Sequence, residues 1–348
     1  MQVGVDMVKS APYVLVALFL LSFLPVTVAD RGMIVPGGVS VYEPGQKAVI
    51  AWDGENEVLI LSTDVWASDN TWALELLPLP SQPAAPEAGS FVSFTTIQNL
   101  LWEYTVDVYS ARGYNAPASA PLEVIFHENI GAHDIAVVRA TSAGELINFV
   151  ENALAGKENA GGVSWSGLEG LVAAYLQKGM SYWVIDLIDL SDYSKSRKPI
   201  VYTFKSDYLY FPLEISSLAS GQTDITLFTL TNDNLDVSSA EAAGFHVATF
   251  VAGGENVALE FGVGENELQQ ISPRVAELFQ GGARLTVLSY QGLLSSLRGD
   301  LMLEARQVAV AAEQEVDRTL AGILAVVMIC LLLAVCGLTY AIGSKSAG

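Results

Sequence analysis

The stretch of residues 319–342 is twenty-four residues long and contains no charged side chain. As an α-helix it would rise about 36 Å, which is enough to cross a hydrocarbon core of ~30 Å with some tilt. A helix in the core of a soluble domain seldom runs this long without a polar face. The stretch therefore predicts a transmembrane helix, and it leaves residues 343–348 as a short tail on the far side.

The opposite end of the chain has the pattern of a secretory leader. Lys9 precedes an apolar run over residues 13–24, and small residues follow it. This pattern predicts a leader over residues 1–29, because an uncleaved anchor would need a longer apolar run. The mature chain would begin at Asp30 and expose everything up to residue 318. We expect a single-pass protein of the cell membrane, with its N-terminal domain outside and its short tail in the cytoplasm.

The segment between leader and span is strongly acidic. It contains fifteen of the seventeen Lys and Arg residues and thirty-seven of the thirty-eight Asp and Glu residues, so its net charge is near −22. Such a surface repels nucleic acid and anionic headgroups, and it favours cations or basic partners. Both cysteines, Cys330 and Cys336, lie inside the span. The outer domain must therefore be held together by packing without disulfides.

Turn signals and apolar runs predict the strands of the outer segment. Asp53-Gly54 separates two β-rich runs and predicts a hairpin between 47–52 and 57–63. Two more hairpins are expected, one between 122–126 and 135–138 and the other between 200–204 and 208–215. Further strands are predicted at 72–77, 182–190, 224–231, 245–251, 258–263 and 284–290.

Capping signals predict the helices. Ser142 with Glu145 and Ser166 with Glu169 form two capping boxes, each followed by apolar residues at helical spacing. Helical segments are also expected at 93–104 and 272–281, the latter because Ser272-Pro273 fits an N-cap followed by proline at the first helical position.

These elements show no regular βαβ alternation, which predicts an α+β fold with largely antiparallel β-sheets and a few inserted helices. We expect one extracytoplasmic domain over 30–290, with 191–199 as the boundary if it contains two subdomains. Apolar residues at spacings of three and four predict a juxtamembrane stalk helix over 291–318, running on into the transmembrane helix.

Several stretches of the outer segment resemble a known family. They are Tyr42-Glu43-Pro44-Gly45-Gln46-Lys47-Ala48, Leu76-Leu77-Pro78-Leu79-Pro80, Gly131-Ala132-His133-Asp134 and the hairpin over 204–213. Over residues 31–230 the chain resembles domain-of-unknown-function family 2330. The resemblance implies a secreted or membrane-anchored prokaryotic protein without an established activity. Many bacterial members carry cysteines near the mature N-terminus, and Arg31-Gly32-Met33 stands there instead, which is more similar to archaeal members.

The densest polar cluster is His127-Glu128 with His133-Asp134, in a chain that has three histidines in all. A hairpin would bring these side chains within reach of one ion. Imidazoles and a carboxylate suffice for a zinc-type site, and a neighbouring glutamate could serve as base. Histidines at strand ends are also commonly structural hydrogen-bonding groups. His127, Glu128, His133 and Asp134 are therefore the candidate ligands of a divalent cation; no other cofactor and no catalytic residue is assigned.

Three further patterns favour a structural interpretation. The run from Gly162 to Ser166 approaches the nucleophile elbow, but it has Ser166 where the second glycine is needed. The oxygen-rich run from Asn232 to Asp236 lacks the EF-hand order, which favours a solvated turn. The remaining pattern is a set of aromatic residues two apart on strands, able to stack on sugars if exposed but expected in the core: Tyr202, Phe204, Tyr208 and Tyr210.

Two classes of function stay open. The first is a cell-envelope protein whose membrane-anchored acidic domain has a structural or binding role, with a cell-surface protein or a glycan as partner. The alternative is an extracytoplasmic metal-dependent hydrolase that uses the loop of His127 and His133. We expect the non-catalytic class, and the oligomeric state stays open.

Overall fold

The computed structural model describes residues 41–42, 45–62, 66–67, 69–116, 133–155, 157, 165, 167–190, 198–219 and 221–305. The chain divides into two units, residues 1–305 and 306–348, and the second lies outside the described residues. The predicted leader and the predicted transmembrane helix also lie outside them. Within the described part, no helix has the length and apolar character needed to cross a membrane.

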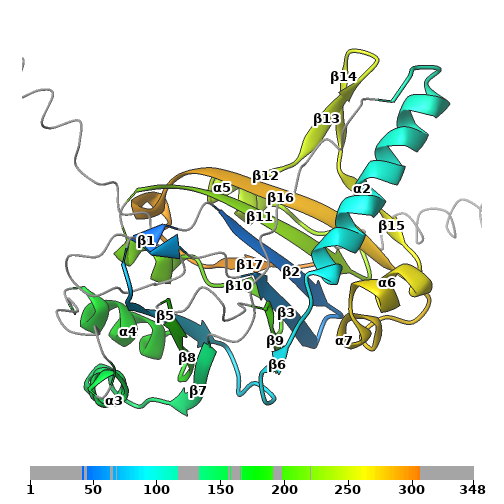
Figure 1. Cartoon of the computed structure of the whole chain (residues 1–348). Helices are drawn as coiled ribbons and strands as arrows, with labels where there is room; N and C mark the ends of the chain where they lie inside the picture. The colour runs from blue at the N-terminus through cyan, green and yellow to red at the C-terminus, as the bar shows by residue number, and fades with distance from the viewer. Residues whose placement is uncertain are drawn as a thin grey trace, which may run out of the picture. The chain divides into compact units, whose positions relative to one another are not determined.

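An eight-stranded sheet runs through the middle of the described unit (Figure 1). Its order is β12-β16-β11-β2-β3-β9-β6, with β15 also paired to β16. Among these strands β11 and β2 pair in parallel and the other neighbours are antiparallel. The strands are β2 (Gln46–Trp52), β3 (Asn56–Ser62), β6 (Glu87–Ala88), β9 (Ile200–Lys205), β11 (Gln222–Thr231), β12 (His246–Val247), β15 (Glu260–Val263) and β16 (Ala283–Leu293).

The turn between β2 and β3 confirms the first predicted hairpin. Asp53 Oδ1 accepts hydrogen bonds from the backbone N–H groups of Glu55 and Asn56, at 2.8 and 2.7 Å. Gly54 has a φ of +107°, which a residue with a Cβ adopts only under strain. The residue types of the turn, an Asx side chain followed by glycine, therefore account for its local geometry.

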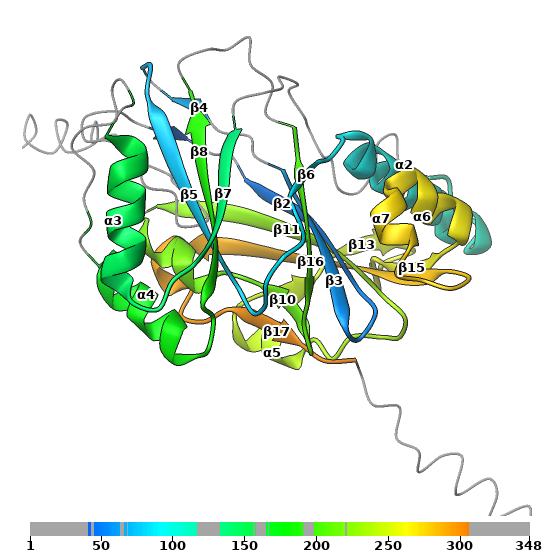
Figure 2. The same ribbon diagram turned by 90° about the horizontal axis from the view of Figure 1, so that it is seen from below.

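A second, three-stranded antiparallel sheet has the order β5-β8-β7. Figure 2 shows it beside the helices α3 and α4. Its strands are β5 (Trp72–Leu79), β7 (His133–Arg139) and β8 (Tyr182–Asp189), and its helices are α3 (Ala143–Leu154) and α4 (Leu168–Gln177). The rings of Tyr175 in α4 and Trp183 in β8 meet edge to face at 5.5 Å, so this helix packs directly on the sheet.

The predicted capping boxes have different outcomes. Ser142 caps α3 as expected, because its side chain accepts from the Glu145 N–H, and Glu145 in turn accepts from Thr141. The predicted capping box of α4 is wrong, although the helix is present. Its N-cap is Gly167, which lies in the left-handed region and provides no side-chain cap. Ser166 lies outside the described residues.

The remaining elements are short or lie near the edges of the unit, apart from the long helix α2. They are β1 (Val41–Tyr42), β4 (Trp66–Ala67), α2 (Val92–Ala111), β10 (Leu209–Phe211), η1 (Glu214–Leu218), α5 (Ser238–Ala242), β13 (Thr249–Ala252), β14 (Glu255–Ala258), α6 (Glu265–Ile271), α7 (Pro273–Ala276), η2 (Leu294–Ser296) and β17 (Leu301–Leu303). The predicted helix at 272–281 is thus much shorter, although Ser272 caps it as expected.

The fold class is confirmed as α+β with mainly antiparallel sheets and few helices, but one predicted hairpin is wrong. β10 pairs with β17 and not with β9, which pairs with β3 and β6. The actual partner of β10 is far away in the sequence, and the local pattern gives no sign of it. β7 pairs with β8, and the predicted hairpin between 122–126 and 135–138 stays a prediction because the 122–126 run lies outside the described residues.

The predicted stalk helix is wrong over residues 291–305. Residues 291–293 end β16, η2 follows, and β17 pairs antiparallel with β10. The apolar spacing that suggested a helical stripe comes instead from leucines that enter the core, since Leu294, Leu297 and Leu301 are at most 2% exposed. The folded unit therefore extends to Ala305; residues 306–318 of the predicted stalk lie outside the described residues.

Both faces of the large sheet are covered. One face packs against α2, α6 and α7 and the segment between β12 and β15, in a core that includes Phe94, Phe228 and Leu268. The other packs against β5, β8, α3, α4 and β10, in a core that includes Trp183 and Tyr210. Consequently β2 and β3 are buried almost throughout, and their sequences are apolar runs without alternation.

We expect the described unit to need residues 291–305 for folding. A chain ending at Ala305 should unfold cooperatively under reducing conditions, whereas one ending at Tyr290 should not, because it lacks β17 and four buried leucines, each contributing about 1.5–3 kcal/mol. Thermal melts followed by near-UV circular dichroism measure this.

Two point variants test the same boundary. Leu301→Ala should lower the free energy of unfolding by about 2–5 kcal/mol, and the half-exposed Leu293→Ala should lower it by about 0.5 kcal/mol or less. Equal costs would contradict the revised boundary.

Candidate functional site

His133 begins β7 and forms a buried pair with a carboxylate. Its Nδ1 lies 2.6 Å from Oδ2 of Asp186, on the neighbouring strand β8. The two side chains are 8% and 3% exposed. A ring nitrogen bonded to a carboxylate carries a hydrogen, so Nδ1 of His133 donates to Asp186.

Strand register puts a second carboxylate on the same face of this sheet. Asp186 lies directly opposite Glu75 of β5 on one side and Ile135 of β7 on the other. Directly opposed residues share a face, as do residues two apart, so His133, Ile135, Asp186 and Glu75 all share it. Glu75 is 5% exposed and has an interaction of its own.

Asp134 does not belong to this group. Successive strand residues point to opposite faces, and Asp134 pairs with Lys157 at 2.9 Å, just beyond α3. Lys157 also lies 4.3 Å from the centre of the Trp72 ring. The structure therefore separates His133 from Asp134, although the sequence predicted both as ligands of one ion.

His127 and Glu128, the other two predicted ligands, lie outside the described residues. Within the described part, no group of three or more His, Cys, Asp or Glu side chains is arranged to hold a metal ion. Two atoms near His133 nevertheless stand out. Nε2 of His133 and Oδ1 of Asp186 are both buried and neither has a hydrogen-bond partner.

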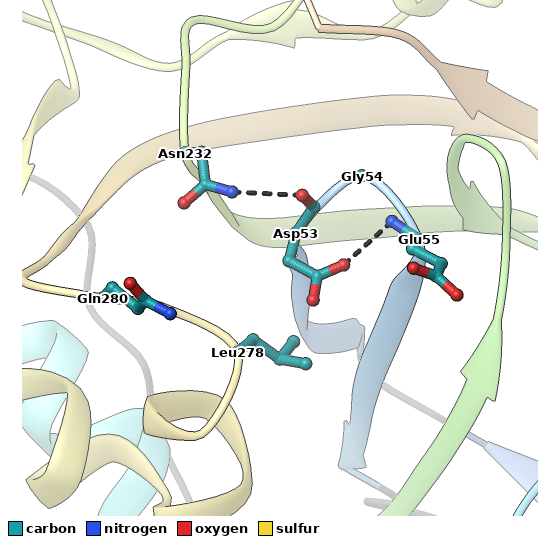
Figure 3. Close-up of a pocket in the computed structure, with 6 residues that line it drawn as sticks. All are labelled: Asp53, Gly54, Glu55, Asn232, Leu278 and Gln280. Atoms are coloured by element: carbon teal, nitrogen blue, oxygen red, sulfur yellow. Dashed lines mark hydrogen bonds between the residues drawn. The ribbon is translucent and has the colours of Figure 1, made fainter.

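The predicted turn after β11 lines a shallow surface hollow of about 560 Å³ (Figure 3). Asn232 Nδ2 donates to the backbone oxygen of Asp53 at 3.0 Å, and the carboxylate of Asp53 is bound within its own turn. Glu55 pairs with Lys205 at 2.7 Å. The oxygen atoms around the hollow thus serve the turns, which agrees with the structural interpretation of this run.

The strand aromatics are also structural. Tyr202, Phe204 and Tyr210 are at most 3% exposed, and Tyr208 is partly buried against the same core. The predicted core role is therefore confirmed for Tyr202, Phe204 and Tyr210, and Tyr208 packs against the same core with part of its ring exposed. Ser164 and Ser166 of the nucleophile-elbow pattern lie outside the described residues.

A buried polar network escaped the sequence analysis. Asp300 Oδ1 accepts from the Tyr175 hydroxyl at 2.7 Å and from the Leu213 and Glu214 N–H groups at 3.0 Å each. Burial raises the pKa of Asp300, while the hydrogen bond from Tyr175 acts to lower it. Burial and the neighbouring Asp300 also raise the pKa of Tyr175. The residues of this network come from segments far apart in the sequence, and no local motif marks them.

Glu57 is the most deeply buried acid described. It is 0% exposed, Oε2 accepts from the Tyr210 N–H at 2.6 Å, and Oε1 has no partner. Burial raises the pKa of this carboxyl well above its usual range, against the smaller effect of the Tyr210 hydrogen bond. Burial thus favours the protonated form of this carboxyl in the folded state.

The C-terminal half of α2 and the β13–β14 hairpin form a projecting arm (Figure 1). The Tyr109 hydroxyl and the Arg112 guanidinium of α2 donate to the backbone oxygens of Val251 and Ala252 on β13. Phe250 stacks on Tyr109, with 5.9 Å between ring centres. These contacts brace a two-stranded hairpin that would be marginal alone.

The tip of the arm exposes apolar side chains. Val251 is 57% exposed and Tyr114 is 53% exposed. Tyr114 lies against Gly253, where an added Cβ would come within 2.7 Å of its ring. Glu255 at the start of β14 is exposed, and its carboxylate pairs with the Arg112 guanidinium at 3.0 Å. We call Val251, Tyr114 and Gly253 the tip patch.

These features define a class of protein: a mixed-sheet α+β domain with buried polar pairs and a braced projecting arm. The chain belongs to the family described as an uncharacterized protein conserved in bacteria (DUF2330), whose model matches residues 25–291. The resemblance drawn from the sequence is thereby confirmed. The family description names bacteria, and the closer likeness to archaeal members stays a prediction.

The chain is similar in part to solved structures of baculovirus P35. A crystal structure of P35 has 9% identity and a TM-score of 0.39, covering 78% of this chain and 99% of that chain. A mutated P35 after caspase cleavage has 8% identity and a TM-score of 0.38, covering 75% and 99%. The caspase-8/P35 complex has 7% identity and a TM-score of 0.35, covering 75% and 96%. Likeness at this level carries no argument about this chain. A search of curated proteins found no match.

Glu57 generates a pH prediction. Its folded-state pKa lies above its unfolded value of about 4.3, so its stabilising contribution is present below that pH and is lost as pH rises toward the folded pKa. Glu57→Gln has no carboxyl that can lose a proton, so it lacks this loss of stability. The free energy of unfolding of Glu57→Gln minus that of the natural chain should therefore increase with pH, by at most about 1.4 kcal/mol per pH unit. Urea unfolding from pH 4 upward measures it. The exposed Glu103→Gln should show no such trend, and a falling difference for Glu57→Gln would refute the assignment.

Proposed function

We propose that this chain is a cell-envelope binding protein, whose acidic domain lies outside the cytoplasm and is held at the membrane by residues 319–342. The uncharged stretch and the leader pattern support this topology. The folded unit ends at residue 305, which leaves 306–318 as the connection to the proposed span.

The arm is the observation that supports a binding role. It places Val251 and Tyr114 in solvent at the end of a braced projection, and contiguous exposed apolar groups are the common mark of interaction sites. At the tip itself the Glu255 carboxylate pairs with Arg112 at 3.0 Å. The charge argument for a partner therefore comes from the whole segment between leader and span, whose net charge near −22 favours a protein segment with apolar side chains flanked by Lys or Arg.

A metal-dependent hydrolase using the His127/His133 loop is the second candidate. One observation favours it: the buried pair with Asp186 fixes the His133 ring and leaves Nε2 available. A carboxylate-oriented histidine is a frequent part of metal sites and of general bases. No substrate class follows from this pair, so the binding role comes first.

A designed peptide tests the binding role. An extended peptide of alternating Val and Lys should bind the full chain in detergent micelles, and its Val and Glu counterpart should not. Tyr114→Ala with Val251→Ser should weaken binding at least about tenfold, because each apolar contact contributes about 1.5–3 kcal/mol. Val92→Ser is the matched control, since Val92 is 58% exposed at the other end of α2. Fluorescence anisotropy gives the affinities, and equal losses in both variants would exclude the arm as the binding surface.

The topology has a separate test. Intact-mass measurement of the membrane-extracted protein should give a chain that begins at Asp30 and retains residues 319–348. Protease added to intact cells should digest the outer domain and leave a fragment containing the span. A mass that still includes residues 1–29, or a protein recovered only from the cytoplasm, contradicts this part of the proposal.

A further inference from the structure

The end of α2 places Tyr114 at the tip of the arm. Gly113 follows the helix with a φ of +76°, in the left-handed region, and its N–H donates to the backbone oxygen of Ser110 at 3.0 Å. The Tyr114 N–H donates to the backbone oxygen of Tyr109 at 2.8 Å. These two bonds around a left-handed glycine form a Schellman motif, which ends a helix and turns the chain. The backbone at Tyr114 is therefore fixed, although the side chain is 53% exposed.

The turn of the β13–β14 hairpin contacts the Tyr114 ring. Gly253 and Gly254 form this turn with φ values of +66° and +85°, at which a residue with a Cβ is strained. A Cβ added at Gly253 would lie 2.7 Å from Cε2 of Tyr114 and 3.2 Å from its hydroxyl oxygen. A Cβ added at Gly254 would meet no atom within 4 Å. The ring thus occupies the space that a side chain at position 253 would need, whereas position 254 has a similar backbone and no such contact.

In the tip patch only Tyr114 has a side chain that attracts a cation. The face of a tyrosine ring carries partial negative charge and attracts Lys or Arg within about 6 Å of the ring centre. Other rings of this domain have such a contact: Lys157 lies 4.3 Å from the centre of the Trp72 ring, and Lys178 lies 5.0 Å from that of Tyr175. Among the described residues, no Lys or Arg lies over the Tyr114 ring in this way.

We propose that Gly253 is a positioning residue, which keeps the Tyr114 ring where it receives a Lys or Arg side chain of the partner. The role of Gly253 rests on the proposed function, because it specifies which part of the partner the tip patch recognises. A ring that is fixed before binding loses little conformational freedom on binding, and this raises the affinity. The exposed Val251 beside it takes the neighbouring apolar side chain of the same partner.

The position of the ring is measured first, without a partner. The full chain labelled with fluorotyrosine is observed by fluorine NMR in detergent micelles, and the Tyr114 resonance is identified by its absence in Tyr114→Phe. Gly253→Ala should shift this resonance toward that of the unfolded chain, because the new methyl group displaces the ring. Gly254→Ala is the matched control and should leave the resonance unchanged. Both variants should lower the Tm by similar amounts, since each places a Cβ in the left-handed region.

Binding of the peptide of alternating Val and Lys is then measured by fluorescence anisotropy with the unlabelled chain. Tyr114→Phe should bind like the natural chain because it keeps the ring. Tyr114→Leu should weaken binding about two- to fivefold, the range of an exposed cation–π contact, because it keeps an apolar side chain and loses the ring face. Gly253→Ala should weaken binding about as much as Tyr114→Leu, and Gly254→Ala should not.

The outcomes separate this role from the proposed function. A natural chain that binds neither the Val and Lys peptide nor its Glu counterpart contradicts both. Binding that responds equally to the two alanine variants, or a Tyr114 resonance that stays in place in Gly253→Ala, overturns the role of Gly253 alone. Equal binding by Tyr114→Leu and Tyr114→Phe overturns the contact with a cation.

A further measurement does not require that the variants fold. In the natural chain the fluorine of Tyr114 should show a nuclear Overhauser effect to the Hα protons of Gly253, because the Cβ position of Gly253 lies 2.7 Å from the ring. Absence of this effect would also overturn the positioning role.

Discussion

The burial of both faces of the eight-stranded sheet is the constraint on which the rest of the fold depends. β2 and β3 have almost no exposed residue, so each of their polar groups needs a partner or a neutral form. Thr229 on the adjacent β11 meets this demand by donating to the Thr286 backbone oxygen at 2.8 Å. Glu57 meets part of it by accepting from the Tyr210 N–H at 2.6 Å, and its burial raises the pKa of the carboxyl. Without disulfides in the outer segment, this packing and its buried polar bonds carry the stability of the domain.

Contacts between residues close together in the sequence were predicted correctly, whereas contacts between distant segments were not. The Asp53-Gly54 turn and the Ser142 cap depend on neighbours within four residues, and both were predicted correctly. The β10–β17 pairing joins segments about ninety residues apart, so the leucines of 291–305 were assigned to a helix. A spacing of three and four residues suits a helical stripe, but irregular strands and 3₁₀ turns can also satisfy it when each leucine finds the core separately.

At the candidate site, too, local features were predicted and long-range contacts were not. His133 was singled out correctly as a notable residue, but its partner Asp186 lies 53 residues away and is supplied by strand pairing. Asp134 was grouped with His133 because both were placed in a loop. Once β7 is known to begin at His133, the two-residue period of a strand sends Asp134 to the other face. The buried Tyr175–Asp300 pair had no sequence signal, since its residues are 125 positions apart.

The side-chain hydrogen bonds along β13 have a consequence for protein solubility. Exposed strand edges offer free carbonyl groups on which another chain can build a sheet, and proteins crowded on a surface meet such edges often. Here the Tyr109 hydroxyl already occupies the carbonyl oxygen of Val251. The hairpin can thus project into solvent with a side chain as apolar as Val251 while its backbone resists recruitment into intermolecular fibres.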